Sequence, residues 1–243
     1  MSRFIDYFAK IIRNYIPLNC PQCGGEPFDG VPGHFCAECL KEFHFIHSPV
    51  CPRCGGELSG ILDVCTDCLH STLDFPWKRA VAVFKMTGAV KESIYRFKYR
   101  NCPEYARAFG QLAAGALRES GIRPDLIVPT PLHWFRYCRR GYNQADLLAQ
   151  RIGRELNLPT AHLLRRKKWT RQQARLDRAE RIRNLEGAFS IRDSTNCKGR
   201  CILLVDDVMT TGSTLAAGAR VLLDAGVAEV NVLVLARRQR DSL

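Results

Sequence analysis

The segment that most constrains the fold of this chain runs from Cys201 to Thr214 and reads Cys-Ile-Leu-Leu-Val-Asp-Asp-Val-Met-Thr-Thr-Gly-Ser-Thr. Its first five residues, 201–205, are continuously apolar, which is typical of a central parallel strand covered on both faces. Two carboxylates follow, and a turn rich in hydroxyl groups then leads into a helical pattern. A buried strand, a polar loop and a helix in this order predict an α/β fold with a mostly parallel sheet and helices on both faces.

The loop after this strand has the chemistry of a ribose-phosphate site. Open parallel sheets bind ligands at the carboxyl ends of their strands, where helix amino termini offer unpaired N–H groups. The predicted phosphate-binding residues are Thr210, Thr211, Gly212, Ser213 and Thr214. Asp206 and Asp207 suit ribose hydroxyls or a Mg²⁺ ion bound with the sugar, so they are the predicted catalytic pair. The competing interpretation is an ordinary strand end followed by a Ser/Thr helix cap.

These residues resemble the motif of phosphoribosyltransferases that use phosphoribosyl pyrophosphate (PRPP): an apolar strand, two acidic residues and a Thr-Gly turn. Further segments resemble the ComF family, and the gluconate-associated GntX proteins are similar. These segments are Val128-Pro-Thr-Pro-Leu-His133, Arg140-Gly-Tyr-Asn-Gln144, Gln173-x-x-Leu176, and Arg181-x-x-Asn184 with Phe189. The resemblance implies a type I phosphoribosyltransferase-like domain behind a zinc-binding amino-terminal region, and a role in DNA uptake during natural transformation.

The resemblance also implies residues for the leaving group. In the family the 128–133 loop holds pyrophosphate, and the residues at 139–144 belong to a mobile segment, or lid, near it. The corresponding residues are Pro129, Thr130, Arg139, Arg140, Asn143 and Gln144. Hypoxanthine-type enzymes carry an aspartate where this chain has Thr210, which disfavours purine salvage. The expected activity is a phosphoribosyl transfer from Mg²⁺-bound PRPP to an acceptor that the sequence does not identify.

Eight of the twelve cysteines occur in four Cys-x-x-Cys pairs. Cys-Pro-Gln-Cys-Gly-Gly-Glu at 20–26 recurs as Cys-Pro-Arg-Cys-Gly-Gly-Glu at 51–57, and a second pair follows each copy. This spacing is typical of zinc, because two such pairs complete a tetrahedron of thiolates. The predicted ligands of two structural Zn²⁺ ions are Cys20, Cys23, Cys36 and Cys39, and Cys51, Cys54, Cys65 and Cys68. An interleaved pairing stays open, whereas a disulfide framework would require an exported chain.

The order of these patterns predicts three regions. Residues 1–18 have the spacing of an amphipathic helix, residues 19–75 form a double zinc ribbon, and residues 80–243 form the phosphoribosyltransferase-like domain. The predicted strands are 80–84, 125–130, 160–164, 201–205 and 229–236, and the predicted helices are 88–98, 104–120, 144–157 and 213–225. No stretch is long and apolar enough to cross a membrane, and reduced thiols without an export signal favour the cytoplasm.

Basic residues give the chain a formal net charge of +12. They are concentrated between positions 133 and 183, which hold fourteen Lys and Arg but four Asp and Glu. Aromatic residues alternate with arginines from Trp134 to Tyr142, an arrangement suited to single-stranded nucleic acid. A second basic cluster with an aromatic residue, also predicted to bind nucleic acid, consists of Arg165, Arg166, Lys167, Lys168 and Trp169.

This charge distribution supports an alternative function. The chain would then be a non-catalytic competence or regulatory protein that binds single-stranded DNA or nucleotide on a transferase scaffold. The ribbons would serve either function by docking a DNA-uptake helicase or another protein. The competing interpretation of the same residues is a solvated charged face with aromatic core or lid residues.

Overall fold

The computed structural model of the chain describes residues 19–58, 61–167, 187–192 and 197–239. Its centre is a four-stranded parallel sheet in the order β1-β6-β5-β2. The strands are β1 (Ala80–Lys85), β2 (Leu126–Pro129), β5 (Cys201–Met209) and β6 (Glu229–Arg237). β5 and β6 lie in the middle and are almost entirely buried, as their continuous apolar runs predict. The predicted α/β fold with a parallel sheet is confirmed.

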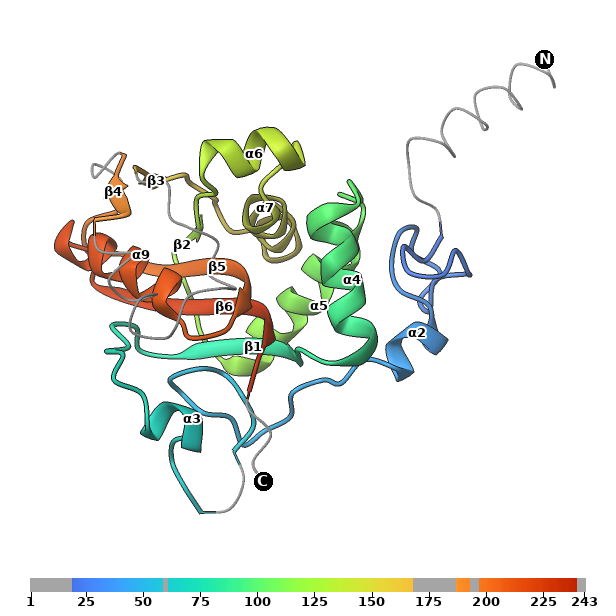
Figure 1. Cartoon of the computed structure of the whole chain (residues 1–243), viewed down its shortest axis with the longest axis horizontal. Coiled ribbons are helices and arrows are strands. Elements are labelled where there is room, and N and C mark those ends of the chain that lie inside the picture. Colours follow the sequence, from blue (N-terminus) through green and yellow to red (C-terminus); the bar gives the residue numbers. More distant parts are fainter. Residues whose placement is uncertain (1–18, 59–60, 168–186, 193–196, 240–243) are drawn as a thin grey trace.

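Helices cover both faces of the sheet (Figure 1). α5 (Tyr105–Ser120) and α7 (Gln144–Leu156) pack on one face with α4 (Gly88–Tyr99) beside α5, and α9 (Ser213–Asp224) packs on the other. Alternate side chains of β5 enter the two layers: Leu203 joins the core on the α5 side, and Leu204 joins the core on the α9 side. A further short helix, α6 (Trp134–Arg140), was not among the predicted helices. Within the described ranges, no helix has the length and apolar character needed to cross a membrane.

The predicted strand at 160–164 is wrong. Thr160 alone bridges to the sheet, at Ile127 on the β2 edge. The preceding residue is Pro159, which has no N–H group to extend a ladder, and the chain then leaves the sheet. It forms a short antiparallel pair instead, in which β3 (Leu164–Arg166) pairs with β4 (Phe189–Ile191) next to α9.

The Cys-x-x-Cys cysteines form two groups in sequential order. Within each group the four Sγ atoms lie within 4.8 Å of one another. The first cluster is Cys20, Cys23, Cys36 and Cys39, and the second cluster is Cys51, Cys54, Cys65 and Cys68. Each includes a short helix, α2 (Ala37–Lys41) in the first ribbon (residues 20–41) and α3 (Thr66–Leu69) in the second ribbon (residues 51–69). The pairing that the internal repeat predicted is therefore observed, and the interleaved pairing is not.

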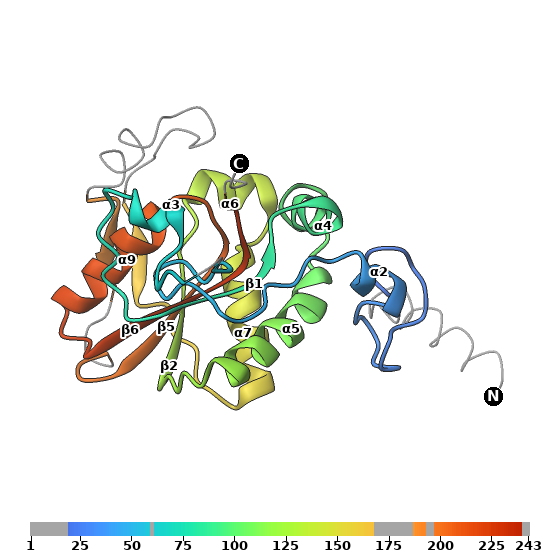
Figure 2. The same cartoon turned by 90° about the horizontal axis from the view of Figure 1, so that it is seen from below.

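The two ribbons pack on opposite faces of the sheet, and the chain between them follows the outer edge of β1 (Figure 2). Phe35 of the first ribbon contacts Phe109 of α5, with ring centroids 5.2 Å apart. The second cluster joins the core that also contains α9 residues. Between the ribbons, Phe45 forms an antiparallel bridge with Phe84, and the Ile46 N–H donates to the Val83 carbonyl at 2.9 Å. This segment thereby pairs a strand edge that would otherwise be open.

Gly55 allows the second ribbon to touch the β1 backbone. It has a φ of +70°, and a Cβ at this position would lie 2.6 Å from the Ala82 nitrogen. Gly24 occupies the matching position of the first repeat with a φ of +79°, but a Cβ there would have no neighbour within 4 Å. The glycine of this motif therefore forms a turn in the first ribbon. In the second ribbon it forms a turn and also allows close contact with β1.

We predict that Gly55→Ala lowers the stability of the protein more than Gly24→Ala. Both substitutions force an alanine into the left-handed region, at about 1–2 kcal/mol. Gly55→Ala also drives a Cβ into the β1 backbone, and such overpacking typically adds about 1–3 kcal/mol. Thermal unfolding of the two zinc-loaded variants measures the difference, and equal losses of stability would contradict the docking role of Gly55.

Candidate functional site

β5 extends beyond its predicted end and contains the two aspartates. The predicted strand stopped at Val205, but β6 continues to pair with β5 as far as Met209 and Arg237. β2 ends at the partner of Val205. Asp206 and Asp207 therefore lie beyond the end of β2, in a part of β5 that still pairs with β6. This overhang places them at the carboxyl edge of the sheet, where open α/β folds bind ligands.

A cavity of about 420 Å³ lies at this overhang. Its walls come from the end of α4, the loop after β2, α6, the start of α7, β3 and the loop between β5 and α9. The lining residues are Lys98, Tyr99, Thr130, Pro131, Leu132, Phe135, Arg136, Arg139, Arg140, Asn143, Gln144, Arg166, Asp206, Asp207, Val208, Thr210 and Thr214. The fold thus brings together residues that the sequence assigned separately to ribose, phosphate and pyrophosphate.

The two aspartates have different surroundings. Asp207 forms an ion pair with Lys98 of α4, in which Oδ1 and Nζ are 2.8 Å apart. Asp206 accepts a hydrogen bond from the Asp207 N–H at 2.9 Å. Burial, together with the charge of Asp207, raises the pKa of Asp206 from 3.8 to about 7. In the protein alone, ionising Asp206 is unfavourable. A cation bound beside it would therefore stabilise its carboxylate form.

Arginines form another part of the cavity wall. Burial and the charge of Arg140 lower the pKa of Arg136, and burial and the charge of Arg136 lower the pKa of Arg166 to about 10. These side chains stay protonated at neutral pH and repel one another. Arg140 also lies over the Tyr99 ring, with Cζ 4.7 Å from the ring centroid. An anion would relieve this repulsion, and guanidinium groups match phosphate oxygens in a bidentate way.

The loop between β5 and α9 supplies hydroxyl and amide groups. Thr210 and Thr214 line the cavity. Between them, the Thr211 and Ser213 hydroxyls share a hydrogen bond of 2.8 Å. Gly212 is the N-cap of α9 with a φ of +85°, a conformation that L side chains rarely adopt. The Ser213 N–H donates to the Thr211 hydroxyl at 3.4 Å. Gly212 itself offers no side-chain acceptor, so the first turn of the helix favours an anion.

Asn143 and Gln144 join the parts of the cavity wall. The Asn143 amide donates to the Thr130 carbonyl at 2.9 Å, and its oxygen caps the first turn of α7 at 3.2 Å. Gln144 donates to the Phe97 carbonyl near the end of α4 at 3.2 Å and accepts from Arg140 at 3.0 Å. The sequence assigned both residues to pyrophosphate or the lid. In the structure they line the cavity and also tie α4, α7 and the loop after β2 together.

Some predicted residues lie elsewhere. Pro129 ends β2 and is not among the residues that line the cavity. In the predicted basic cluster, Arg166 lines the cavity, whereas Lys167 is exposed and the exposed Arg165 donates to the Ser190 hydroxyl at 2.9 Å. The predicted residues outside the described ranges are Lys168, Trp169, Gln173, Arg181 and Asn184. The described part of the basic cluster is therefore divided between the cavity and the surface.

Three basic residues of this region were not predicted as site residues: Lys98, Arg136 and Arg237. Arg136 lies in the predicted stretch of alternating aromatic residues and arginines, whereas Lys98 and Arg237 belong to no motif. The three residues come from different elements, α4, α6 and β6. Lys98 stands 109 positions before its partner Asp207 in the chain. For Lys98 and Arg237 the available signal was a basic residue at the end of a predicted element, which does not distinguish a site residue from a solvated charge.

The two cysteine clusters have the donor set of structural zinc sites. Four thiol groups that converge within 4.8 Å suit the tetrahedral, closed coordination of Zn²⁺. All four cysteines of the second cluster are buried, whereas Cys23 of the first is exposed. Four sulfur ligands leave no position for a substrate, so a bound Zn²⁺ would cross-link the chain and thereby stabilise each small ribbon.

Comparison with known protein families covers both regions of the chain. Residues 11–69 match the double zinc ribbon domain family. Residues 98–243 match the phosphoribosyl transferase domain family, which is more than half of the chain. The second match includes the aspartates, the β5–α9 loop and the arginines of the cavity.

Several relatives match the chain over most of its length. The chain is 36% identical over 233 residues to Competence protein F of Haemophilus influenzae, covering 93% of this chain and 100% of that protein. It is 35% identical over 213 residues to the DNA utilization protein YhgH of Escherichia coli, covering 84% of this chain and 92% of that protein. Competence protein ComFC of Bacillus subtilis is 32% identical over 202 residues, or 79% of each chain. The chain therefore belongs to the ComF/YhgH family of proteins with a phosphoribosyltransferase domain and an amino-terminal double zinc ribbon.

Proposed function

We propose that this protein binds PRPP with Mg²⁺ in the cavity at the β5 overhang and transfers the phosphoribosyl group to an acceptor. The observation that carries the proposal is that one cavity contains two adjacent carboxylates and a group of basic side chains. A ribose phosphate requires both kinds of group, because its hydroxyls and metal ion suit carboxylates and its phosphates suit cations. The match to the phosphoribosyl transferase domain family supports the same ligand class.

Each part of the cavity has a role in this proposal. Asp206 and Asp207 hold the ribose hydroxyls or the metal ion that accompanies the sugar. The loop from Thr210 to Thr214 holds the 5′-phosphate with its hydroxyl and amide groups. Arg139 and Arg140, together with the loop after β2, hold the pyrophosphate group.

The transfer breaks the bond between the ribose C1 and a pyrophosphate oxygen, and the electron pair leaves with pyrophosphate. A nucleophilic atom of the acceptor forms the new bond to C1. Basic side chains around the leaving oxygens stabilise the negative charge that develops on them, and the cavity walls hold the two reactants in line. Positioning and charge stabilisation are therefore the contributions of the protein.

The names of the relatives support a cellular process in which this reaction would take place. Two of them are competence proteins and one is a DNA utilization protein. Within the proposal, the protein acts in DNA uptake during natural transformation. It works in the cytoplasm, where reducing conditions keep the ribbon cysteines available as thiolates.

The double variant Asp206→Asn/Asp207→Asn is predicted to lose Mg²⁺-dependent PRPP binding. Removing two charged hydrogen-bond acceptors costs about 1.5–3 kcal/mol each, which corresponds to a loss of affinity of about a hundredfold or more. Titration calorimetry with and without Mg²⁺ measures this effect. Asp224→Asn, at the exposed far end of α9, is the matched control and is expected to bind normally. PRPP binding that is the same in the double variant and the wild type would reject the assignment.

Asp206→Asn is predicted to stabilise the protein at pH 8 more than at pH 5. Because the pKa of Asp206 is raised to about 7, the folded protein retains a proton that the unfolded chain releases at lower pH. Wild-type stability therefore falls between about pH 4 and pH 7, and the asparagine variant avoids this loss. Thermal unfolding of both proteins at each pH measures it, with about 2–4 °C expected for each kcal/mol. A variant that is less stable than the wild type at pH 8 would contradict the buried-charge account.

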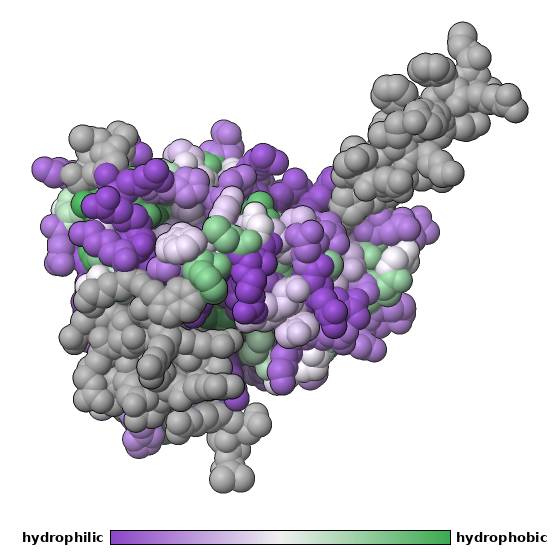
Figure 3. Space-filling view, turned by 45° about the horizontal axis from the view of Figure 1, so that its top comes forward, coloured by the Kyte–Doolittle hydropathy of each residue, from purple (hydrophilic) through white to green (hydrophobic). Residues whose placement is uncertain are grey.

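A second candidate function, binding of single-stranded DNA, is favoured by the exposed aromatic residues of α6. Trp134 and Tyr137 are 68% and 52% exposed and lie on the same short helix as Arg136, Arg139 and Arg140. Figure 3 shows mainly hydrophilic residues on the face that comes forward in that view, with scattered hydrophobic groups among them. Aromatic rings among cations suit a strand whose bases stack and whose phosphates follow the basic residues.

If this second candidate is correct, single-stranded DNA binding falls steeply with salt and is weakened in Trp134→Ala/Tyr137→Ala. Stacking contributes about 1–3 kcal/mol per base, so we predict a loss of about fivefold or more. Fluorescence anisotropy over a range of salt concentrations measures both effects. Phe28→Ala removes an equally exposed ring from the first ribbon and serves as the control. DNA binding that does not change with salt concentration would count against this candidate. So would an equal loss of affinity in Trp134→Ala/Tyr137→Ala and Phe28→Ala.

A further inference from the structure

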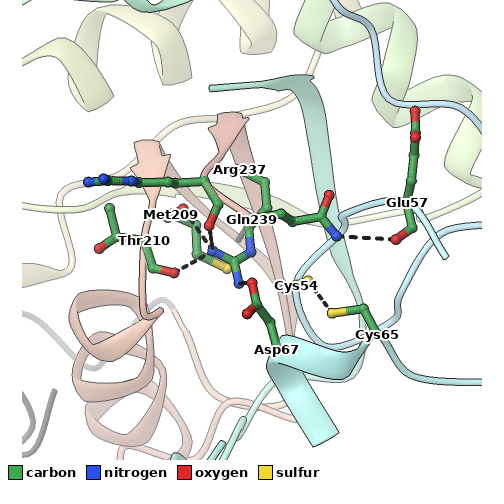
Figure 4. Close-up of polar contacts among 9 residues, drawn as sticks. Cys54, Glu57, Cys65, Asp67, Met209, Thr210, Arg237 and Gln239 are labelled. Carbon is green, nitrogen blue, oxygen red and sulfur yellow. Dashed lines mark hydrogen bonds and ion pairs between the residues drawn. The ribbon is translucent and has the colours of Figure 1, made fainter. Parts of the chain in front are cut away.

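Arg237 connects the end of β6 to the loop between β5 and α9. It is 5% exposed, although it carries a charge. Its Nη1 donates to the carbonyl oxygens of Met209 and Thr210 and to that of the adjacent Arg238. Figure 4 shows the guanidinium between these carbonyls and the second ribbon. A buried side chain therefore contacts the backbone at the start of the loop, where the Met209 carbonyl also accepts from the Arg238 N–H at 3.0 Å.

The other side of this guanidinium faces the second ribbon. Its Nη2 lies 3.4 Å from Oδ2 of Asp67, which stands in α3 between Cys65 and Cys68. Cys54 of the same cluster lies close enough for the arginine charge to act on it (Figure 4). Four thiolates around one Zn²⁺ have an excess of negative charge. A loaded cluster and a carboxylate therefore provide the anionic partners that a buried guanidinium requires.

A second contact joins the same two regions. A Cβ on Gly212 would lie 3.3 Å from Cη2 of Trp77, so the loop and this ring are in close contact. The Trp77 indole N–H donates to the carbonyl of Arg53, inside the Cys51–Cys54 knuckle, at 2.9 Å. The loop thus rests on the second ribbon both at Thr210, through Arg237, and at Gly212, through Trp77.

The first ribbon has no equivalent contact among the described residues. Glu38 occupies the position that matches Asp67 in the repeat, and it pairs with Lys41 at 2.8 Å on the surface. The first ribbon instead docks on the helices of the other face, where the Gln22 side chain accepts from Ser93 and Tyr105 at 2.8 Å. The two copies of the repeat therefore pack differently: the first contacts the helices α4 and α5, and the second contacts the loop between β5 and α9.

We propose that Arg237 is a positioning residue that anchors the phosphate loop to the second zinc ribbon. Through its contacts with the Met209 and Thr210 carbonyls on one side and Asp67 on the other, it holds the loop in the conformation that receives the ligand. The part of this inference that concerns ligand affinity rests on the proposed function. The part that concerns the loop itself does not, because loop mobility is measurable without any ligand.

The experiment compares four full-length, zinc-loaded variants with the wild type. Arg237→Gln and Asp67→Asn remove the two sides of the contact. Arg238→Gln removes the same charge from the exposed neighbour, and Glu38→Gln changes the matching residue of the first ribbon. Hydrogen–deuterium exchange of the peptide that contains residues 209–213 reports on the loop without ligand. Zinc content and calorimetric PRPP affinity are measured on the same samples.

Arg237→Gln and Asp67→Asn are expected to retain two zinc ions, to exchange faster in the loop and to bind PRPP at least about tenfold more weakly, since each removes the charged contact between Arg237 and Asp67. Arg238→Gln and Glu38→Gln are expected to behave as the wild type. Arg237→Lys should restore part of the affinity, because it keeps the charge but not the fork of donors.

Wild-type exchange rates in the loop of both Arg237→Gln and Asp67→Asn would overturn the proposal even if PRPP binds. So would the loss of a zinc ion from Arg237→Gln, because Arg237 would then be a structural part of the ribbon. If no protein binds PRPP while loop exchange still rises in these two variants, the positioning role stands and the proposed function fails.

Discussion

The site depends on the unequal lengths of the strands that flank β5. β6 pairs with β5 over its whole length, whereas β2 stops at the partner of Val205. The four residues beyond Val205 are therefore supported on one side by a buried strand and open on the other. Two carboxylates lie in this overhang, and the loop between β5 and α9 follows it. A β2 strand of the same length would pair with this segment and remove the space for a ligand.

Charge in the cavity is balanced only in part by the protein. Lys98 pairs with Asp207, but the pKa of Asp206 is raised and the pKa values of Arg136 and Arg166 are lowered. Without a ligand, the charged forms of both this carboxyl group and these arginines are therefore unfavourable. A molecule with both phosphates and a metal ion would reduce both costs at once, which is how binding sites commonly trade stability for affinity.

The zinc ribbons are built into the same structure as the larger domain. Cysteines of the first cluster belong to the core on the α5 face, and those of the second belong to the core on the α9 face. Modules of a few dozen residues cannot bury a sufficient core alone, and here the sheet supplies the remaining surface. The chain between the ribbons also protects the β1 edge. Removing this region would therefore expose both apolar surface and the outer edge of β1.

Local patterns in the sequence determined the parallel strands, the two cysteine clusters and the acidic loop, because apolar runs, metal-ligand spacing and turn chemistry act between residues that are close in the chain. The strand expected at 160–164 was wrong because pairing depends on a partner edge as well as on the pattern. The tertiary structure alone decided that Lys98 meets Asp207 and that Arg237 meets both the loop and Asp67. Those contacts arise when the sheet and its helices pack, and a lone basic residue in a sequence does not reveal which distant group it will neutralise.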